Sequence, residues 1–463
     1  MRCFVACAAA LLSACTATKP AAPGPEQPSL TASVQALFPE PDATGVCTDA
    51  VLGLSFGAKV SVGTAGSIRV YRASDASAPV DSIDVAAPSY VDIIGGRQFH
   101  TRRPVVVRDG RVSVHLHSAV LEPNTAYYVE IDPGVLVDAD GRPLPGIEGS
   151  AAWGFQTGSG TPADPTSLRV AADGSGDFCT VQGAVDHVPA NNTTPTLIAI
   201  QAGFYDEIVM IAGKHALTLR GDDRKNTIIT YPNNETLQAG GGTKFRALVE
   251  AENVNGLVIE NLTLHNTTPQ GGSQAEALRV EPGDQVILRN ADFKSLQDTL
   301  LLSGRVYVHD CYVEGNVDYV WGKGTAYFER CELKTVGRGG YQVQSRNTTN
   351  YGYVFVDSTL SADPGVSGHL LGRIEIDRFP SSHVAYVDCT LGPHIAPQGF
   401  AIENLTNPED AASLRFWEYR SRDASGALVD VSQRIQQSKQ LTEAEAATMR
   451  DKSVVFGGWN PTE

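Results

Sequence analysis

Residues 287–333 read ILRNADFKSLQDTLLLSGRVYVHDCYVEGNVDYVWGKGTAYFERCEL and contain one seven-residue pattern three times. The pattern has two apolar or aromatic residues, two polar residues, a small residue, a polar residue and an apolar residue, as in YVHDCYV (307–313). Three further copies surround this stretch. The central residues of all six copies, which are small, apolar or Cys and lie 29, 20, 20, 27 and 31 residues apart, are Leu262, Ala291, Cys311, Cys331, Ser358 and Cys389.

A strand-forming repeat of about 20–30 residues is typical of a solenoid. The 3.6-residue periodicity of helical repeats is absent, and a small or apolar residue at one recurrent position fits a narrow interior. We therefore predict an all-β chain whose residues 167–463 form a right-handed parallel β-helix. Cys311 and Cys331 would be neighbours in its stack, as packing residues and not as a disulfide.

The preceding residues 34–158 have a different pattern, with short alternating strands such as Val112–Leu116 and Tyr127–Ile131 separated by turns. This pattern predicts a small β-sandwich. The segments FPEPDATGVCTDAVLGLSF and WGFQT resemble bacterial Ig-like domains. Residues 159–166 (SGTPADPT) would be the linker to the β-helix.

The first residues are typical of an export signal, because an apolar run after Met1-Arg2 is too short to span a bilayer. The run ends in Leu12-Ser13-Ala14-Cys15, which resembles a bacterial lipobox. We predict a lipoprotein signal over 1–15, an acylated Cys15 and a Pro/Ala-rich tether over 16–33. The protein would then be held at the outer membrane or cell surface by this anchor alone. The alternative is a plain secretory signal cut near Ala14, which would give a periplasmic or secreted protein.

The net charge and the cysteine pattern argue against several classes of function. The 463-residue chain has a formal net charge of −16, which argues against nucleic-acid binding and favours a largely neutral, esterified polymer over a polyanion. No Cys/His spacing suggests a metal site, and no cofactor is expected. Five cysteines lie beyond the signal, so at least one is expected to be a buried thiol. We expect a monomer.

Two aspartates occupy equivalent positions of adjacent coils, because Asp298 follows Ala291 by seven residues and Asp318 follows Cys311 by seven. Equivalent positions of neighbouring coils are about 4.8 Å apart, so the carboxylates should stand side by side. Two like charges this close separate in pKa, which suits an acid beside a nucleophile or base. The alternative is that each aspartate caps a turn, but the shared offset favours catalysis. Gln274 and Gln297 could donate to an oxyanion, and Arg373 could hold one aspartate ionised.

At these residues the chain resembles the pectin methylesterase family. The resemblance covers residues 167–461 and rests on an ordered series of motifs: VAADGSGDFCTVQGAVDHVP (170–189), GFYDE (203–207), QAEALRV (274–280), QDTL (297–300), DYVWGKG (318–324) and LGR (371–373). It implies demethylation of the methyl-galacturonate units of pectin, with release of methanol and pectate.

The resemblance also implies residue roles. Asp318 matches the nucleophile, Asp298 the general acid/base, Gln274 and Gln297 the oxyanion-binding amides, and Arg373 the arginine that orients the nucleophile and contacts substrate. The family's LGRPW is LGRIE here, so Glu375 replaces the expected sugar-stacking tryptophan. We therefore predict that Trp321 and Tyr319 contact the substrate, with a core position as the alternative for Trp321.

Three other functions fit part of the pattern. A β-helix lyase or galacturonase would need a calcium cluster, or a third aspartate with a histidine, and neither pattern is apparent. A thioesterase acting on acyl-CoA is kept open by the altered LGRIE segment. A non-catalytic carbohydrate-binding solenoid would not need both aspartates, both glutamines and the arginine.

Overall fold

The computed structural model describes residues 34–462 except 88–89, 100–103, 338–339 and 349. The predicted signal, Cys15 and the tether lie outside the described residues. No helix among the described residues is long and apolar enough to cross a membrane.

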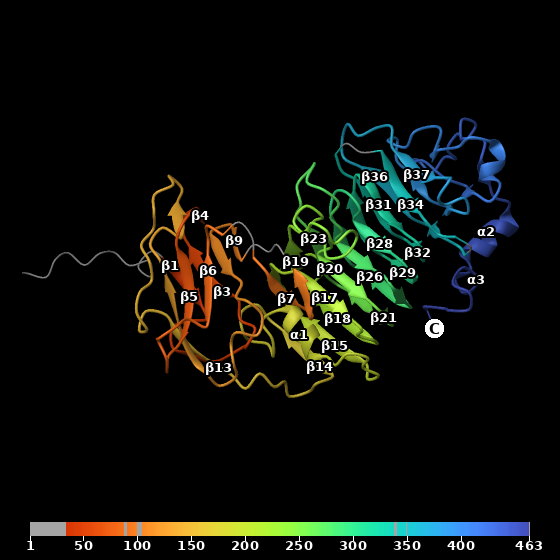
Figure 1. The fold of residues 1–463 in the computed structure, drawn as a ribbon. Coiled ribbons are helices and arrows are strands. Elements are labelled where there is room, and N and C mark those ends of the chain that lie inside the picture. Colours follow the sequence, from red (N-terminus) through yellow and green to blue (C-terminus); the bar gives the residue numbers. More distant parts are fainter. Residues whose placement is uncertain (1–33, 88–89, 100–103, 338–339, 349, 463) are drawn as a thin grey trace, which may run out of the picture.

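The first β domain consists of two sheets that face each other across a common core, with Leu54, Val129 and Trp153 among its buried residues (Figure 1). One sheet contains β1 (Val34–Phe38), β3 (Leu52–Phe56), β10 (Arg111–Val114) and β9 (Val105–Arg108). The other contains β2 (Ala43–Val46), β13 (Gly154–Thr157), β11 (Ala126–Ile131), β5 (Ser67–Arg72) and β6 (Asp81–Asp84). Two strand pairs complete the domain: β4 (Val60–Val62) with β12 (Leu136–Asp138), and β7 (Asp92–Ile94) with β8 (Arg97–Phe99).

From β14 onward the chain winds into a parallel β-helix, as predicted, in which successive coils add one strand to each of three long parallel sheets. The longest sheet contains β14 (Ser167–Val170), β15 (Thr196–Ile200), β18 (Leu217–Gly221), β22 (Val258–Glu260), β26 (Val286–Arg289), β29 (Arg305–His309), β32 (Thr325–Glu329), β35 (Tyr353–Val356), β38 (His383–Val387), β41 (Arg415–Tyr419) and β42 (Ser438–Gln440). The second contains β16 (Gly203–Tyr205), β19 (Thr227–Tyr231), β23 (Thr263–Asn266), β27 (Asp292–Lys294), β30 (Tyr312–Gly315), β33 (Glu332–Thr335), β36 (Thr359–Ala362) and β39 (Thr390–Leu391).

The third sheet, called the site sheet below, contains β17 (Val209–Ala212), β20 (Val249–Glu252), β24 (Leu278–Val280), β28 (Leu300–Leu302), β31 (Val317–Gly322), β34 (Tyr341–Ser345), β37 (Leu370–Glu375) and β40 (Phe400–Glu403). A short pair, β21 (Val254–Asn255) and β25 (Gly283–Asp284), lies at one corner of the coils.

The recurrent small residues line the interior, as the sequence pattern predicts. Their exposed fractions are 2% or less, and Cys311, Cys331 and Cys389 are free thiols, which confirms the packing role. The residue before each small residue has a positive φ, from 47° at Asn290 to 57° at Asn261. Asn and Asp adopt this left-handed conformation more readily than other non-glycine residues, which explains why the corner is so often polar.

Short helices lie at the two ends of the β-helix (Figure 1). Helix α1 (Val181–His187) begins at Thr180, whose side chain accepts from the Gly183 N–H, and covers the first coil. At the far end, η2 (Pro408–Ala411) precedes β41, and α2 (Glu443–Arg450) and α3 (Lys452–Val455) pack on the outer face of the longest sheet.

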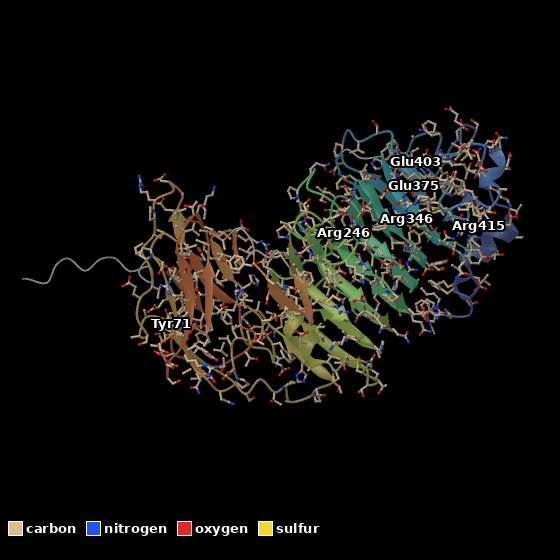
Figure 2. All side chains as sticks on the ribbon, viewed as in Figure 1. Tyr71, Arg246, Arg346, Glu375, Glu403 and Arg415 are labelled. Atoms are coloured by element: carbon tan, nitrogen blue, oxygen red, sulfur yellow. A yellow bond between two sulfur atoms is a disulfide. The ribbon has the colours of Figure 1, made fainter. Side chains whose placement is uncertain are left out.

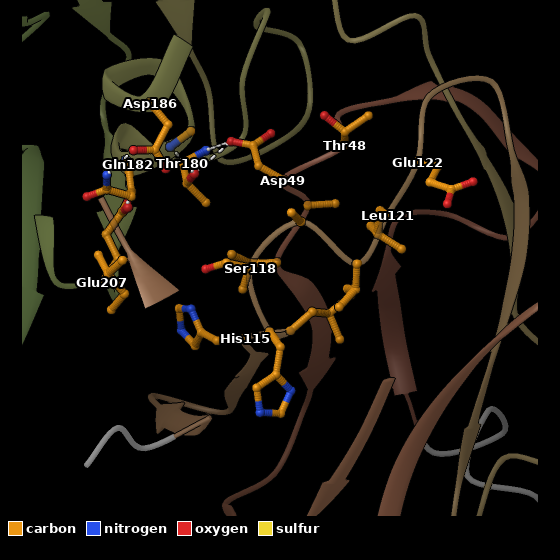
Figure 3. A pocket seen from close by; sticks show the side chains of 18 of the residues that line it. Thr48, Asp49, His115, Ser118, Leu121, Glu122, Thr180, Gln182, Asp186 and Glu207 are labelled. Atoms are coloured by element: carbon orange, nitrogen blue, oxygen red, sulfur yellow. Dashed lines mark hydrogen bonds between the residues drawn. The ribbon is translucent and has the colours of Figure 1, made fainter. Parts of the chain in front are cut away.

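The two parts of the chain are joined covalently, because Cys47 of the first domain forms a disulfide with Cys179 beside α1. The β7–β8 pair also packs on the β-helix, and its Phe99 ring meets Phe245 edge-on at 5.5 Å. A cavity of about 410 Å³ remains between the two parts, lined by Asp49, His115, Thr180 and Glu207 among others (Figure 3). It lies beside the first coil.

Candidate active site

Three carboxylic acids occupy consecutive positions across the site sheet. The pairings Leu278↔Leu300 and Leu300↔Val320 place Glu276 opposite Asp298 and Asp298 opposite Asp318. The Asp298 N–H donates to the Val317 carbonyl at 3.0 Å, which fixes the alignment of Asp298 with Asp318. Each step between neighbouring strands is about 4.8 Å. The predicted pair of aspartates is therefore part of a row of three acids.

Both aspartates have a left-handed backbone conformation, with φ of 68° at Asp298 and 45° at Asp318. Aspartate adopts this conformation more readily than most non-glycine residues. The side chains are almost fully covered, with residue exposures of 7% for Asp298 and 5% for Asp318. A bound ester would thus meet two rigid, poorly hydrated carboxyl groups.

Arg373 on β37 holds Asp318 through two parallel hydrogen bonds. Its Nε donates to Oδ1 at 3.0 Å and its Nη2 donates to Oδ2. Its Nη1 donates to both oxygens of Glu403 on β40, at 2.9 and 3.1 Å, and its guanidinium centre lies 4.9 Å from the Tyr341 ring centroid. The donors are thus taken by carboxylates, which fits the orienting role better than the substrate-binding role.

Arg246, just before β20, joins the other two acids of the row. Its Nη2 donates to Oδ2 of Asp298 at 2.9 Å, and its Nε and Nη2 donate to Glu276 at distances from 2.7 to 3.0 Å. Its Nη1 donates to Glu235 at 2.8 Å. The residue exposures of Arg246 and Glu276 are only 4% and 0%, so a buried ion pair lies directly beside Asp298.

The pKa values of the two aspartates separate in this environment. Burial raises the pKa of Asp298 well above its usual range, and the neighbouring charges of Glu276 and Asp318 raise it further against the opposing effect of Arg246. Burial also raises the pKa of Asp318, but the hydrogen bonds from Arg373 counteract that increase. Asp298 therefore retains a proton more strongly than Asp318, which is the division needed between an acid and a nucleophile.

The two glutamines lie at the same edge of the site sheet. Gln297 directly precedes Asp298, and the Ala275 N–H, next to Gln274, donates to the Gln297 carbonyl at 3.2 Å. Both side chains are half-buried. Within the described residues, no protein group accepts a hydrogen bond from either side-chain amide, so both are available to an oxyanion.

The aromatic prediction needs correction at Tyr319. Tyr319 has 0% exposure and belongs to the interior core, because a β-bulge between Val317 and Val320 turns it inward, so it does not contact a substrate. Trp321 faces outward but has only 5% exposure, because the guanidinium centres of Arg346 and Arg246 lie 4.6 and 5.7 Å from its ring centroid. The ring lies against two arginines, and its contact with substrate stays a prediction, since Asp318 beside it has the same exposure of 5%.

Among the described residues, potential metal ligands cluster only at Cys47, Asp49 and Cys179, far from the row of acids along the β-helix. The two sulfurs there form the disulfide, and Asp49 accepts hydrogen bonds from Thr180. That cluster is structural.

The family model of pectinesterases matches residues 167–455, the whole β-helix up to the end of α3. The chain belongs to the pectinesterase family. Pectinesterase 31 of Arabidopsis thaliana is 34% identical over 294 residues, which cover 60% of this chain and 89% of the relative. Pectinesterase 2 of Olea europaea is 28% identical over 363 residues, covering 74% and 89% of the two chains.

Solved structures of pectin methylesterases are also similar to this chain. The pectin methylesterase from carrot is 26% identical with a TM-score of 0.56, covering 65% of this chain and 97% of that one. A mutant pectin methylesterase in complex with a hexasaccharide is 25% identical with a TM-score of 0.55, covering 64% and 98%. This pectinesterase is therefore an enzyme, a carboxylic ester hydrolase that demethylates pectin.

The outer wall of the pectinesterase site contains residues that the sequence patterns did not single out. Arg346 follows β34, and its charge acts on both aspartates. Its Nη2 donates to Gln344 at 2.6 Å, and Gln344 donates to Glu375 at 2.9 Å. Figure 2 shows Arg246, Arg346, Glu375 and Glu403 over the same stretch of the β-helix. At the position where the family motif has a tryptophan, this chain has Glu375, which is hydrogen-bonded to Gln344 and through it to Arg346.

Proposed function

We propose that this pectinesterase hydrolyses the methyl esters of pectin with Asp318 as nucleophile and Asp298 as general acid and base. The observation that supports it most is the paired placement of Asp298 and Asp318, one strand apart, with Arg373 bonded to Asp318 and not to Asp298. An ionised carboxylate and a protonated carboxyl are then available to one ester at the same time.

In the proposed cycle, a carboxylate oxygen of Asp318 attacks the ester carbonyl, and the amides of Gln274 and Gln297 donate to the resulting oxyanion. The intermediate collapses, the C–O bond to methanol breaks, and Asp298 gives its proton to the leaving methoxide oxygen. The substrate acyl group is now joined to Asp318 as an anhydride. Asp298, now ionised, takes a proton from water, whose oxygen attacks the substrate acyl carbon. The bond between that carbon and the Asp318 oxygen breaks, which returns Asp318 to a carboxylate and leaves Asp298 protonated. The new carboxyl group of the product loses its proton to solvent, and pectate leaves.

Arg373→Gln should move the acidic limb of the kcat/KM profile to higher pH. The arginine favours the ionised form of Asp318, so its removal leaves burial unopposed and raises the pKa of the nucleophile, by about 1–3 units for a close charge partner. The profile is measured by methanol release. Arg378→Gln is the control, because Arg378 pairs with Glu375 at 3.6 Å and is not bonded to Asp318. Coincident acidic limbs for Arg373→Gln and wild type would contradict the role of Arg373.

The function itself is tested with highly methylated pectin. The expected result is methanol release at a constant number of chain ends, with no new reducing ends and no unsaturated ends. The same enzyme is offered an acyl-CoA under the same conditions, and turnover of the thioester in place of the pectin ester would overturn the proposal.

We also propose that the enzyme is exported, acylated on Cys15 and held at the outer membrane or cell surface, where polymeric pectin is accessible. The Leu12-Ser13-Ala14-Cys15 sequence supports this proposal. Cys15→Ala should transfer the enzyme from the membrane fraction to the soluble fraction of cells without changing its specific activity. Retention in the membrane fraction would refute the anchor.

We propose that the first domain is an Ig-like spacer and that the enzyme acts as a monomer. The two facing sheets support the first point. The row of acids is built from one chain, so the proposed chemistry needs no second copy. Light scattering of the purified enzyme tests the monomer, and a dimer mass would refute it.

A further inference from the structure

Asp298 is the middle member of the row of acids, so it has a carboxyl group on each side. Asp318 is one neighbour and belongs to the proposed chemistry. Glu276 is the other neighbour. It does not touch Asp318, and it is fully buried with an exposure of 0%. A buried, ionised glutamate is costly without a partner, and this one is placed directly beside the proposed acid.

Arg246 is shared unequally among the acids around it. Glu276 receives bonds from both Nε and Nη2, at 2.7 to 3.0 Å, which is the strong bidentate arrangement. Asp298 receives one bond, from Nη2 to Oδ2 at 2.9 Å. Glu235 receives one bond at 2.8 Å, but its side chain is 40% exposed and partly solvated.

One positive charge cannot balance three ionised carboxylates in a buried site. Burial raises the pKa of Glu276, but the charge of Arg246 and its bidentate hydrogen bonds oppose that increase and favour the ionised form. Glu235 is stabilised by water. Asp298 receives only one hydrogen bond from Arg246 and also faces the charge of Asp318, so it is the group that keeps a proton. Its Oδ2 is held by Arg246, whereas its Oδ1 makes no hydrogen bond within the described residues. The proton can therefore reside on Oδ1, the oxygen that is not committed to the arginine.

We propose that Glu276 and Arg246 are positioning residues of Asp298: Glu276 keeps Asp298 in its acid form by occupying the charge of Arg246, and Arg246 fixes the orientation of the Asp298 carboxyl. This inference rests on the proposed role of Asp298. Neither residue touches the reacting atoms, so both act through Asp298.

The charged groups that face Asp298 are Arg246, Glu276, Asp318 and Arg346. After burial, the charge of Glu276 is the largest cause that raises the pKa of Asp298, and Arg246 and Arg346 lower it. Removing the charge of Glu276 leaves the two arginines unopposed on that side. The pKa of Asp298 should then fall, and the acid form should be lost at a lower pH.

The experiment compares the kcat/KM profile for methanol release by wild type and Glu276→Gln, which keeps the size of the side chain and removes its charge. The basic limb of Glu276→Gln should move to lower pH by about one unit or more, with KM nearly unchanged at the acidic side of the profile. Glu276→Asp retains the charge and should keep the basic limb near its wild-type position. A basic limb of Glu276→Gln that coincides with that of wild type overturns the proposal.

Glu250→Gln is the matched control. Glu250 is a buried glutamate on β20, paired with Arg279 at 3.2 Å, and burial raises its pKa to about 7, but it makes no bond to Asp298. Its removal should leave the basic limb in place, and a limb that disappears in Glu250→Gln assigns the titration to Glu250 and overturns the proposal.

Arg246→Lys covers the case in which Glu276→Gln does not fold. It retains the charge but not the planar fork, so the basic limb should stay in place while kcat falls about tenfold through loss of the Oδ2 anchor. An unchanged kcat refutes the positioning role of Arg246. Absence of methanol release from wild type would instead refute the proposed function, whereas an active Glu276→Gln enzyme with an unmoved limb refutes only the positioning proposal.

Discussion

Replacing Asp318 with asparagine should reduce kcat for methanol release from methylated pectin by at least about 10³-fold, because an amide cannot attack the ester carbonyl. The backbone should tolerate the change, since asparagine accepts the left-handed conformation of residue 318 at φ 45°. Arg373 would keep its bonds to Glu403. Binding of pectin should therefore persist while turnover is lost, which is measured by methanol release and by retention on immobilised pectin.

The control for this variant is Asp310→Asn. Asp310 has the same left-handed backbone, with φ of 54°, but its carboxylate pairs with Arg330 on the surface, away from the row of acids. It should retain wild-type activity. A fully active Asp318→Asn enzyme would exclude Asp318 as nucleophile, and equal losses in both variants would point to a general effect of the substitution on folding.

Asp298→Asn should lower kcat on the methyl ester by about 10²–10⁴-fold, the range expected for removing a general acid and base. Methoxide is a poor leaving group, so acylation depends on the proton of Asp298. A galacturonate phenyl ester has a leaving group that needs no protonation. Asp298→Asn should therefore release phenol in a burst of one equivalent per enzyme and then stall, because the water that hydrolyses the anhydride is no longer activated.

Asp318→Asn serves as the comparison in the phenyl ester experiment. It lacks the nucleophile, so it should show no burst with either ester. A burst of phenol from Asp318→Asn, or the absence of a burst from Asp298→Asn with the phenyl ester, would contradict the assigned roles.

The solenoid could be predicted from the sequence because interior packing imposes a regular constraint. Ala291, Cys311 and Cys331 are 20 residues apart since two successive coils carry no inserted loop, and the chain has room for only small side chains at those positions. The same regularity predicted the alignment of Asp298 with Asp318. Wherever coils keep a constant length, the register of outward-facing residues follows from counting.

Glu276 was missed because the coil before Asp298 has a different length, so a constant offset from the small residue does not reach it. A local signal does exist. The segments EALRV (276–280), DTLLL (298–302) and DYVWG (318–322) each begin with an acid two residues before a paired apolar residue, which is Leu278, Leu300 or Val320. If the coils are aligned by these strand segments and not by their small residues, the three acids fall in one row.

Other features had no local signal. Arg246, 52 residues before Asp298, reaches it from a loop whose path depends on packing, including the contact of Phe245 with Phe99 of the first domain. The disulfide between Cys47 and Cys179 joins residues 132 positions apart in two separate parts of the chain. Tyr319 was misplaced because a β-bulge breaks the alternation of inward and outward side chains on β31.

The identity of the nucleophile can be measured directly by trapping the acyl-enzyme with hydroxylamine during turnover of methylated pectin oligomers. Attack on the anhydride at the aspartyl carbonyl converts that aspartate to a hydroxamate, which peptide mass spectrometry locates. We expect a hydroxamate on Asp318 that requires substrate and is absent from Asp318→Asn. A substrate-dependent hydroxamate on Asp298, with Asp318 unmodified, would contradict it.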